Sequence, residues 1–254
     1  MKEPLDVAMD KAGIAQVTIN RPSRANAVDP ALAQSMLEAF EWLANDPKLR
    51  VLVLLGNGRT FCAGLDLKAM TEKAAASFEQ NYQDALLLTK LLHRLNTMPV
   101  PTLAVVPGAA IGLGVGLVAC CDVVIASELA TFRFSEVRLG IIPAVISPYA
   151  IAAMGARACR RYFLSGEAFD AAEAMRLGLV HAVSDLDGLG AKTAQLAAEL
   201  HAGKVHAQRA AKTLIEDVRL APVNEDLIQE TARRLAEIRA TPEAQEAFAE
   251  FLKG

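Results

Sequence analysis

The pattern of apolar positions in the first half of the chain predicts strands that alternate with helices. Continuous apolar runs at 50–56 (RVLVLLG) and 102–107 (TLAVVP) are typical of strands buried on both faces. Residues 30–45 carry apolar side chains at helical spacing, and a proline opens this segment. Shorter strands are predicted at 14–20, 122–127 and 131–134, a tight glycine-containing loop at 60–68, and a helix at 79–97.

Helical spacing dominates the second half of the chain. Helices are predicted at 146–154, 157–163, 170–176, 187–200, 206–219 and 224–252. The succession of buried strand, loop and helix predicts an α/β fold with mainly parallel strands. We expect two parts, a core at 1–198 and a helical oligomerisation region at 199–254.

Composition and charge exclude several classes of function. The net charge of −3 gives no basic surface for nucleic acid or for an anionic membrane. The longest apolar stretch, near 102–127, is interrupted by a proline, four glycines and an aspartate, so we expect a core and not a membrane span. The first residues, MKEPLDVAMDKAG, carry acids and no apolar run, which argues against a signal or transit peptide.

The cysteines and histidines point away from metal binding. The four cysteines show no CxxC spacing, and the four histidines form no HExxH motif. Two adjacent cysteines in an apolar run are more typical of small core residues than of disulfides. We therefore expect no metal site and a reducing, cytoplasmic location.

The stretch IGLGVGLVACCD, at 111–122, places three alternating glycines before an apolar run. A dinucleotide-binding GxGxxG motif would need a glycine at 117, where Leu117 stands, and no P-loop lysine follows. One remaining interpretation is that the glycines only let a helix begin tightly against a strand. The other is functional, because the N-terminus of a helix presents free N–H groups.

A second loop of the same kind follows the strand at 50–56, with the sequence FCAGLDLK at 61–68. Two strand-to-loop corners, each with a free backbone N–H, could converge on one carbonyl oxygen. Such an oxyanion hole stabilises the negative charge of a transition state by about 2.7–4 kcal/mol per donor.

Four segments together resemble the enoyl-CoA hydratase/isomerase (crotonase) superfamily: FCAGLDLKAM, PVPTLAVVPGAAIGLGVGLVACCD, FRFSEVRLGIIPAVISPYAI and YFLSGEAFDAAEAMRLGLVHAV. The resemblance implies a spiral of ββα units, a C-terminal helical trimerisation region, and a homotrimer or homohexamer. It implies an acyl-CoA thioester substrate, so that coenzyme A belongs to the substrate and no separate cofactor is needed. By position, the backbone N–H groups of Leu65 and Leu113 would form the oxyanion hole.

The same resemblance singles out one acid. Many hydratases of the superfamily carry a glutamate on the helix after the glycine loop and a second about twenty residues later. Here the first position is Gly116 and the second is Glu136. Glu136 would then be the catalytic acid/base, although a glutamate at a strand-to-helix corner can also be an ordinary surface residue.

Three functions fit a single carboxylate beside a polarised thioester. Glu136 could activate water for addition to the β-carbon of a 2-enoyl-CoA, which makes the protein a hydratase. It could instead move a proton between the α- and γ-carbons, as in a Δ3,Δ2-enoyl-CoA isomerase. The absence of an acid at 116 also leaves open a catalytically silent acyl-CoA binder.

The segment EVRLGIIPAVISPYAI, with the glycine at 116, is most similar to the bacterial methylglutaconyl-CoA hydratase-like branch. That resemblance favours hydration of methylglutaconyl-CoA or a related branched glutaconyl-CoA. Candidates to bind the distal carboxylate of such a substrate are Arg138, Arg160 and Arg161, although solvated or interface arginines are the simpler interpretation.

Residues for the coenzyme A portion follow from the resemblance as well. It places Arg24 and Ala25 near the pantetheine and nucleotide, and Ala63, Asp66 and Leu67 near the adenine. Asp66 could instead cap the next helix. The remaining positions implied are Gly112, where the backbone approaches the thioester, and Phe251 with Lys253, which resemble an aromatic-plus-basic tail that reaches a neighbouring subunit.

Overall fold

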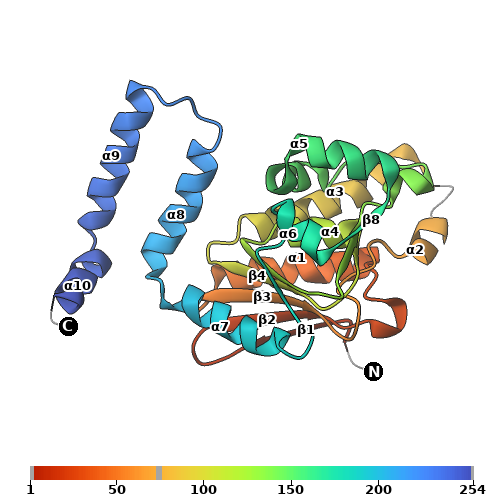
Figure 1. The fold of residues 1–254 in the computed structure, drawn as a ribbon, viewed down its shortest axis with the longest axis horizontal. Coiled ribbons are helices and arrows are strands. Elements are labelled where there is room, and N and C mark those ends of the chain that lie inside the picture. Colours follow the sequence, from red (N-terminus) through yellow and green to blue (C-terminus); the bar gives the residue numbers. More distant parts are fainter. Residues whose placement is uncertain (1–2, 73–75, 253–254) are drawn as a thin grey trace. The chain divides into compact units, whose positions relative to one another are not determined.

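A six-stranded sheet organises the first of the two units into which the chain divides, Met1–Ala198 and Glu199–Gly254. The computed structural model describes residues 3–72 and 76–252. The strands follow the order β1-β2-β3-β4-β6-β9, and only β1 and β2 pair in antiparallel fashion (Figure 1). They are β1 (Leu5–Met9), β2 (Ile14–Ile19), β3 (Val51–Gly56), β4 (Thr102–Val106), β6 (Val123–Ser127) and β9 (Ala182–Ser184).

A smaller sheet of three strands holds the glycine stretch beside the segment that leads to Glu136. Its order is β5-β7-β8, with β5 (Ala110–Ile111) parallel to β7 (Thr131–Arg133), and β7 antiparallel to β8 (Ala168–Asp170). Short 3-10 helices η1 (Pro22–Arg24) and η2 (Glu136–Leu139) lie in two of the connections. Because only two residues separate the end of β7 from η2, this sheet fixes the position of the backbone around Glu136.

Helices pack against the larger sheet and against one another. The first, α1, contacts both β1 and α3 (Figure 1). Asp29 caps α1 by accepting a hydrogen bond from Leu32 N–H, and Ser77 and Gln80 form a capping box at the start of α3. The helices of this unit are α1 (Pro30–Asn45), α2 (Leu67–Glu72), α3 (Phe78–Asn96), α4 (Leu113–Ala119), α5 (Ser147–Ser165), α6 (Ala171–Arg176) and α7 (Leu189–Ala202), which continues into the second unit.

The fold class is the predicted one, a mixed α/β fold with mainly parallel strands, but several boundaries differ. The sequence analysis missed β1, whose alternation is weak because three consecutive residues are exposed. It also placed a loop where α2 begins. The two helices expected at 146–154 and 157–163 both lie within α5, and the break expected between them is confirmed by non-helical backbone at Gly155.

The second unit contains α8 (Val205–Val218), α9 (Glu225–Arg239) and α10 (Pro242–Phe251). The single helix expected at 224–252 is in fact two helices. Thr241 caps the second by accepting from Ala244 N–H, and Pro242 occupies its first turn, where a missing N–H costs nothing. Among the described residues, α8, α9 and α10 bury none of their side chains within this chain.

Over residues 3–72 and 76–252, no helix is both long enough and apolar enough to cross a bilayer.

Candidate active site

Two glycine corners lie side by side because their flanking segments hydrogen-bond to each other. Phe61 N–H donates to Ala109 O at 3.0 Å, and Ile111 N–H donates to Cys62 O at 2.9 Å. These contacts accompany a parallel bridge between Cys62 and Ala110. The segments at 60–65 and 109–113 therefore run in parallel, and both corners open at the same end.

Gly64 and Gly114 permit this close approach. Gly64 adopts φ +91°, and a Cβ there would lie 2.8 Å from Ile111 O and 3.7 Å from Leu113 N. A Cβ at Gly114 would lie 2.4 Å from Cys62 O, which leaves no room for a side chain. The packing interpretation of the glycines is thus correct, and the same packing brings Leu65 next to Leu113.

Two backbone donors remain unused at these corners. Neither Leu65 N–H nor Leu113 N–H donates to any of the residues that the structure describes. Leu113 is the first residue of α4, where N–H groups have no partner within the helix. Both residues line one pocket of about 440 Å³, so the arrangement suits an oxygen that accepts from both.

Glu136 lines the same pocket from the first position of η2, which follows β7. Gly112 N–H donates to Arg133 O at 2.8 Å, which attaches the glycine corner to the end of β7, three residues before Glu136. Gly112 has φ +52°, and a Cβ at this position would lie 3.0 Å from the Glu136 Oε1 atom. The glycine therefore leaves space for the carboxylate beside the first turn of α4.

Burial determines the electrostatics of Glu136. Removal from water raises the pKa of this carboxyl above its ordinary value of 4.5, against a smaller lowering by its own backbone N–H. Its Oε2 atom is buried and accepts no hydrogen bond from the described part of the chain. A half-buried carboxylate with a free oxygen and a raised pKa is better suited than an exposed glutamate to accept a proton and return it.

An apolar side chain fills the position of the absent second acid. A Cβ at Gly116 would lie 2.4 Å from Ile146 Cγ2 and 3.5 Å from Leu92 Cδ1. Both neighbours are fully or almost fully buried. Ile146 thus occupies the volume that a side chain at position 116 would need, and no described acid replaces it there.

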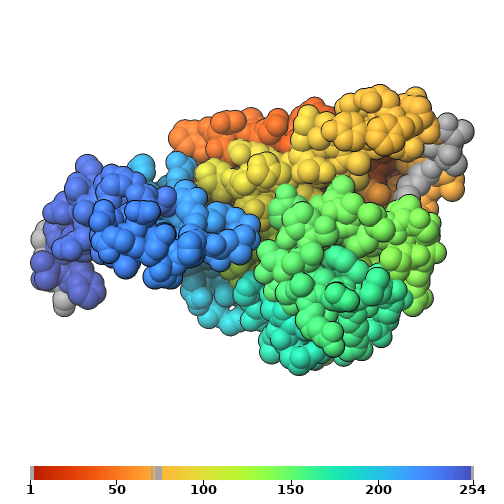
Figure 2. Space-filling model, turned by 90° about the horizontal axis from the view of Figure 1, so that it is seen from above, coloured from red at the N-terminus to blue at the C-terminus, as the bar shows by residue number. Residues whose placement is uncertain are grey.

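The rest of the pocket is mostly apolar. Its wall comes from α3, from the segment after η2, and from the two corners, and Figure 2 shows a recess in the surface between the yellow atoms of α3 and green atoms later in the chain. The apolar residues that line it include Leu88, Leu139, Ile141, Ile142, Val145 and Ile146. Among the described residues that line it, only Glu136 and Arg133 carry ionisable side chains.

The residues expected near coenzyme A form a cluster between η1 and the loop that follows β3. The Arg24 guanidinium lies 3.1 Å from the Asp66 carboxylate, and Ala63 N–H donates to Ala25 O at 3.0 Å. Burial alone would raise the pKa of Asp66, but the N–H groups of Ala69 and Lys68 and the charge of Arg24 together lower it. Asp66 therefore does cap α2, as its alternative interpretation required, and it also pairs with arginine.

Leu67 and the C-terminal tail are the remaining predicted contacts. Leu67 begins α2, lines the pocket and is exposed. Phe251 is exposed at the end of α10, and Lys253 lies outside the described residues.

Arg133 is the pocket residue that the sequence analysis missed. The three arginines considered there, Arg138, Arg160 and Arg161, do not line the pocket. Arg161 pairs with Glu167 at 2.7 Å, and Arg138 donates to Ser165 O at 3.4 Å. The signal that could have identified Arg133 is its place in FRFSE, where the buried Phe132 and Phe134 point to one face and Arg133 to the other.

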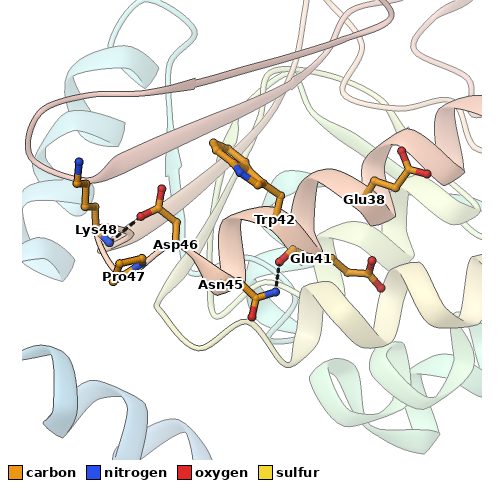
Figure 3. A pocket seen from close by; sticks show the side chains of 7 residues that line it. All are labelled: Glu38, Glu41, Trp42, Asn45, Asp46, Pro47 and Lys48. Atoms are coloured by element: carbon orange, nitrogen blue, oxygen red, sulfur yellow. Dashed lines mark hydrogen bonds between the residues drawn. The ribbon is translucent and has the colours of Figure 1, made fainter.

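A hollow elsewhere on the first unit lacks this chemistry. It lies at the end of α1 around Trp42, where Asn45 donates to Glu41 O and Lys48 N–H donates to Asp46 (Figure 3). Its polar groups bond to one another within the turn that ends α1. Across the described residues, no three histidines, cysteines or acids are grouped to hold a metal ion.

Comparison with known proteins identifies the family of the chain. Residues 9–253 match the family model described as enoyl-CoA hydratase/isomerase. The 2,3-dehydroadipyl-CoA hydratase of Escherichia coli is 33% identical over 238 residues, which cover 93% of this chain and 91% of that protein.

Solved structures share the whole architecture. An enoyl-CoA hydratase from Shewanella pealeana has a TM-score of 0.95 at 36% identity, covering 99% of this chain and 94% of the other. AtuE from Pseudomonas aeruginosa has a TM-score of 0.93 at 32% identity, covering 98% and 96%. The chain therefore belongs to the enoyl-CoA hydratase/isomerase family, the crotonase superfamily.

Proposed function

We propose that the protein adds water to a 2-enoyl-CoA thioester, with Glu136 as the acid/base. The observation that carries the proposal is the placement of a half-buried carboxylate beside Gly112, in one pocket with two unused backbone donors, Leu65 N–H and Leu113 N–H. Donors and carboxylate face the same space, so that a thioester oxygen and its α- and β-carbons could be held at once.

The reaction follows from these groups. The thioester oxygen accepts hydrogen bonds from Leu65 N–H and Leu113 N–H, which draws electrons away from the β-carbon. Glu136 takes a proton from water while the water oxygen bonds to that carbon, and the displaced electron pair moves to the thioester oxygen as an enolate. Glu136 then returns the proton to the α-carbon, the enolate reverts to the thioester, and the carboxylate is regenerated.

The isomerase is the second candidate, favoured by the single carboxylate. Moving a proton from the α- to the γ-carbon of a 3-enoyl-CoA needs one acid/base group, whereas a hydratase with one acid must use that acid twice. Incubation of 2-enoyl- and 3-enoyl-CoA in deuterated water separates the two functions. A 3-hydroxyacyl product with deuterium at the α-carbon supports hydration, and migration of the double bond without hydroxyacyl product contradicts it.

We further propose methylglutaconyl-CoA or a related branched glutaconyl-CoA as the preferred substrate. The apolar lining of the pocket supports a branched chain, and the presence of Arg133 supports an acyl group with a negative charge. The Escherichia coli relative is named for 2,3-dehydroadipyl-CoA, an acyl group that also ends in a carboxylate.

Coenzyme A is proposed to enter as part of the substrate, with Arg24, Ala25, Ala63, Asp66 and Leu67 along its path. The side chain of Arg24 is half-exposed, which leaves the guanidinium accessible to a phosphate even while it pairs with Asp66. In this proposal no other cofactor takes part.

A trimer, or a hexamer of two trimers, is the proposed assembly. The second unit supports it, because large apolar residues on α8, α9 and α10 are exposed: Ile215, Ile228, Leu235, Phe248 and Phe251. Static light scattering at micromolar concentration should give a mass that is a multiple of three chains, and a monomer would contradict the assembly.

A further inference from the structure

We propose that the Arg133 guanidinium is a carboxylate-binding subsite that selects acyl groups with a terminal negative charge. The inference rests on the proposed function and adds the residue that would set the substrate class. It starts from the position of Arg133 at the end of β7, opposite Ile111 in the ladder with β5 and three residues before Glu136. The backbone of Arg133 is thus as firmly placed as that of the glycine corner.

The Arg133 guanidinium donates a hydrogen bond from one of its nitrogens and, within the described residues, from neither of the other two. Arg133 Nε donates to Gly166 O at 2.7 Å. Within the described part of the chain, its two terminal nitrogens donate to no group, and Arg133 forms no ion pair. The bond to Gly166 fixes the plane of the guanidinium and leaves two N–H-bearing nitrogens in the geometry that a carboxylate accepts from.

In the described ranges, Arg133 lacks the counter-ion that several other arginines of this unit have. Arg21 and Arg24 pair with Asp66, and Arg161 and Arg176 pair with nearby glutamates. Arg133 is only partly exposed and lines a pocket whose wall is otherwise mostly apolar. A partly desolvated cation without a partner is costly for the folded chain, and an anionic ligand that enters the pocket would remove that cost.

The pocket identifies which part of the substrate the cation would meet. Arg133 lines it together with Glu136 and Leu113, whereas Arg24, Ala25 and Asp66 do not line it. A phosphate of coenzyme A would be expected at that second group. A carboxylate at the far end of the acyl chain would enter the pocket of Glu136, and Arg133 would offset its repulsion from the Glu136 carboxylate.

Two thioesters of equal carbon skeleton test the subsite. Glutaconyl-CoA and 2-pentenoyl-CoA differ only in a terminal carboxylate in place of a methyl group. The purified full-length protein and its variant Arg133→Met are assayed with both, and kcat/KM for hydration is measured. We expect the ratio of glutaconyl- to pentenoyl-CoA to fall by about 10- to 100-fold in Arg133→Met, the range for loss of a charged hydrogen bond.

Arg138→Met is the matched control. Arg138 also donates to the 165–166 corner but is exposed and lies outside the pocket, so this variant should keep the wild-type ratio. An unchanged ratio in Arg133→Met would overturn the inference, and so would a wild-type protein that hydrates pentenoyl-CoA but not glutaconyl-CoA. Wild-type protein that hydrates neither thioester would instead contradict the proposed hydratase function.

Discussion

The two walls of the pocket differ in chemistry although both come from the same small region of the fold. The wall made by β7 and η2 carries Arg133 and Glu136, which among the described residues are the only ionisable side chains that line the pocket. The wall made by α4 and the start of α5 is apolar, with Gly116 covered by Ile146. In this account the charged wall binds a charged group and transfers protons, while the apolar wall determines the shape of the pocket.

The difference shows how one missing side chain can be compensated by packing. Gly116 has no Cβ, and the side chain of Ile146 lies so close to it that its Cγ2 atom would overlap any side chain at position 116. The pocket is therefore closed on that side by a hydrocarbon and not by a carboxylate. In the proposed mechanism every proton transfer then depends on Glu136.

Glu136→Gln removes the carboxylate from the charged wall and should have the largest effect on activity. Without a group that accepts a proton, hydration of a 2-enoyl-CoA should slow by at least about 100-fold, within the range of general acid–base catalysis. Steady-state hydration rates measure the effect. Glu128→Gln is the matched control, because Glu128 is exposed and lies outside the pocket.

A thermal melt separates lost chemistry from lost folding. Burial raises the pKa of Glu136 in the folded chain, so the charged form destabilises the fold above that pKa and the penalty disappears below about 4.5. At neutral pH Glu136→Gln should therefore melt no lower than wild type. A variant that keeps full activity would remove Glu136 from the mechanism.

Gly116→Glu tests the apolar wall and should mainly affect stability. The new Cβ would lie 2.4 Å from Ile146 Cγ2 in a fully buried place, and the carboxylate would lose its water. We expect a loss of about 1–3 kcal/mol or more in the free energy of unfolding, from overpacking and burial of a charge. Denaturant titration measures it, and Gly190→Glu should be nearly neutral because Gly190 is exposed with open space around it. A Gly116→Glu protein as stable as wild type that hydrates faster would show that this wall can accept a second acid.

The sequence predicted the charged wall in part and the corners well. The helix at 30–45 and the buried strands followed from periodicity, and the family resemblance, which the comparisons confirm, drew attention to Leu65, Leu113, Gly116 and Glu136. Glycine spacing and apolar runs pointed to the two corners, because they record local backbone requirements, whereas the assignment of these four positions came from the resemblance.

The parts that the sequence did not predict depend on contacts between distant segments. Ile146 fills the space beside Gly116, thirty residues earlier in the chain, and Arg133 is oriented by the carbonyl of Gly166. The strand β1 was missed because an edge strand with few buried residues lacks a clear period. None of these relations leaves a local pattern in the sequence.

The pH dependence of kcat/KM for hydration tests the central claim most directly, namely that one buried carboxylate moves the protons. Glu136 must be ionised to accept a proton from water, so activity should rise with pH through the raised pKa of this group and be lost below it. The account predicts an acid limb that reports a single ionisation, centred above 4.5. An acid limb that needs two ionisations, or one centred at or below the ordinary glutamate value, would contradict it.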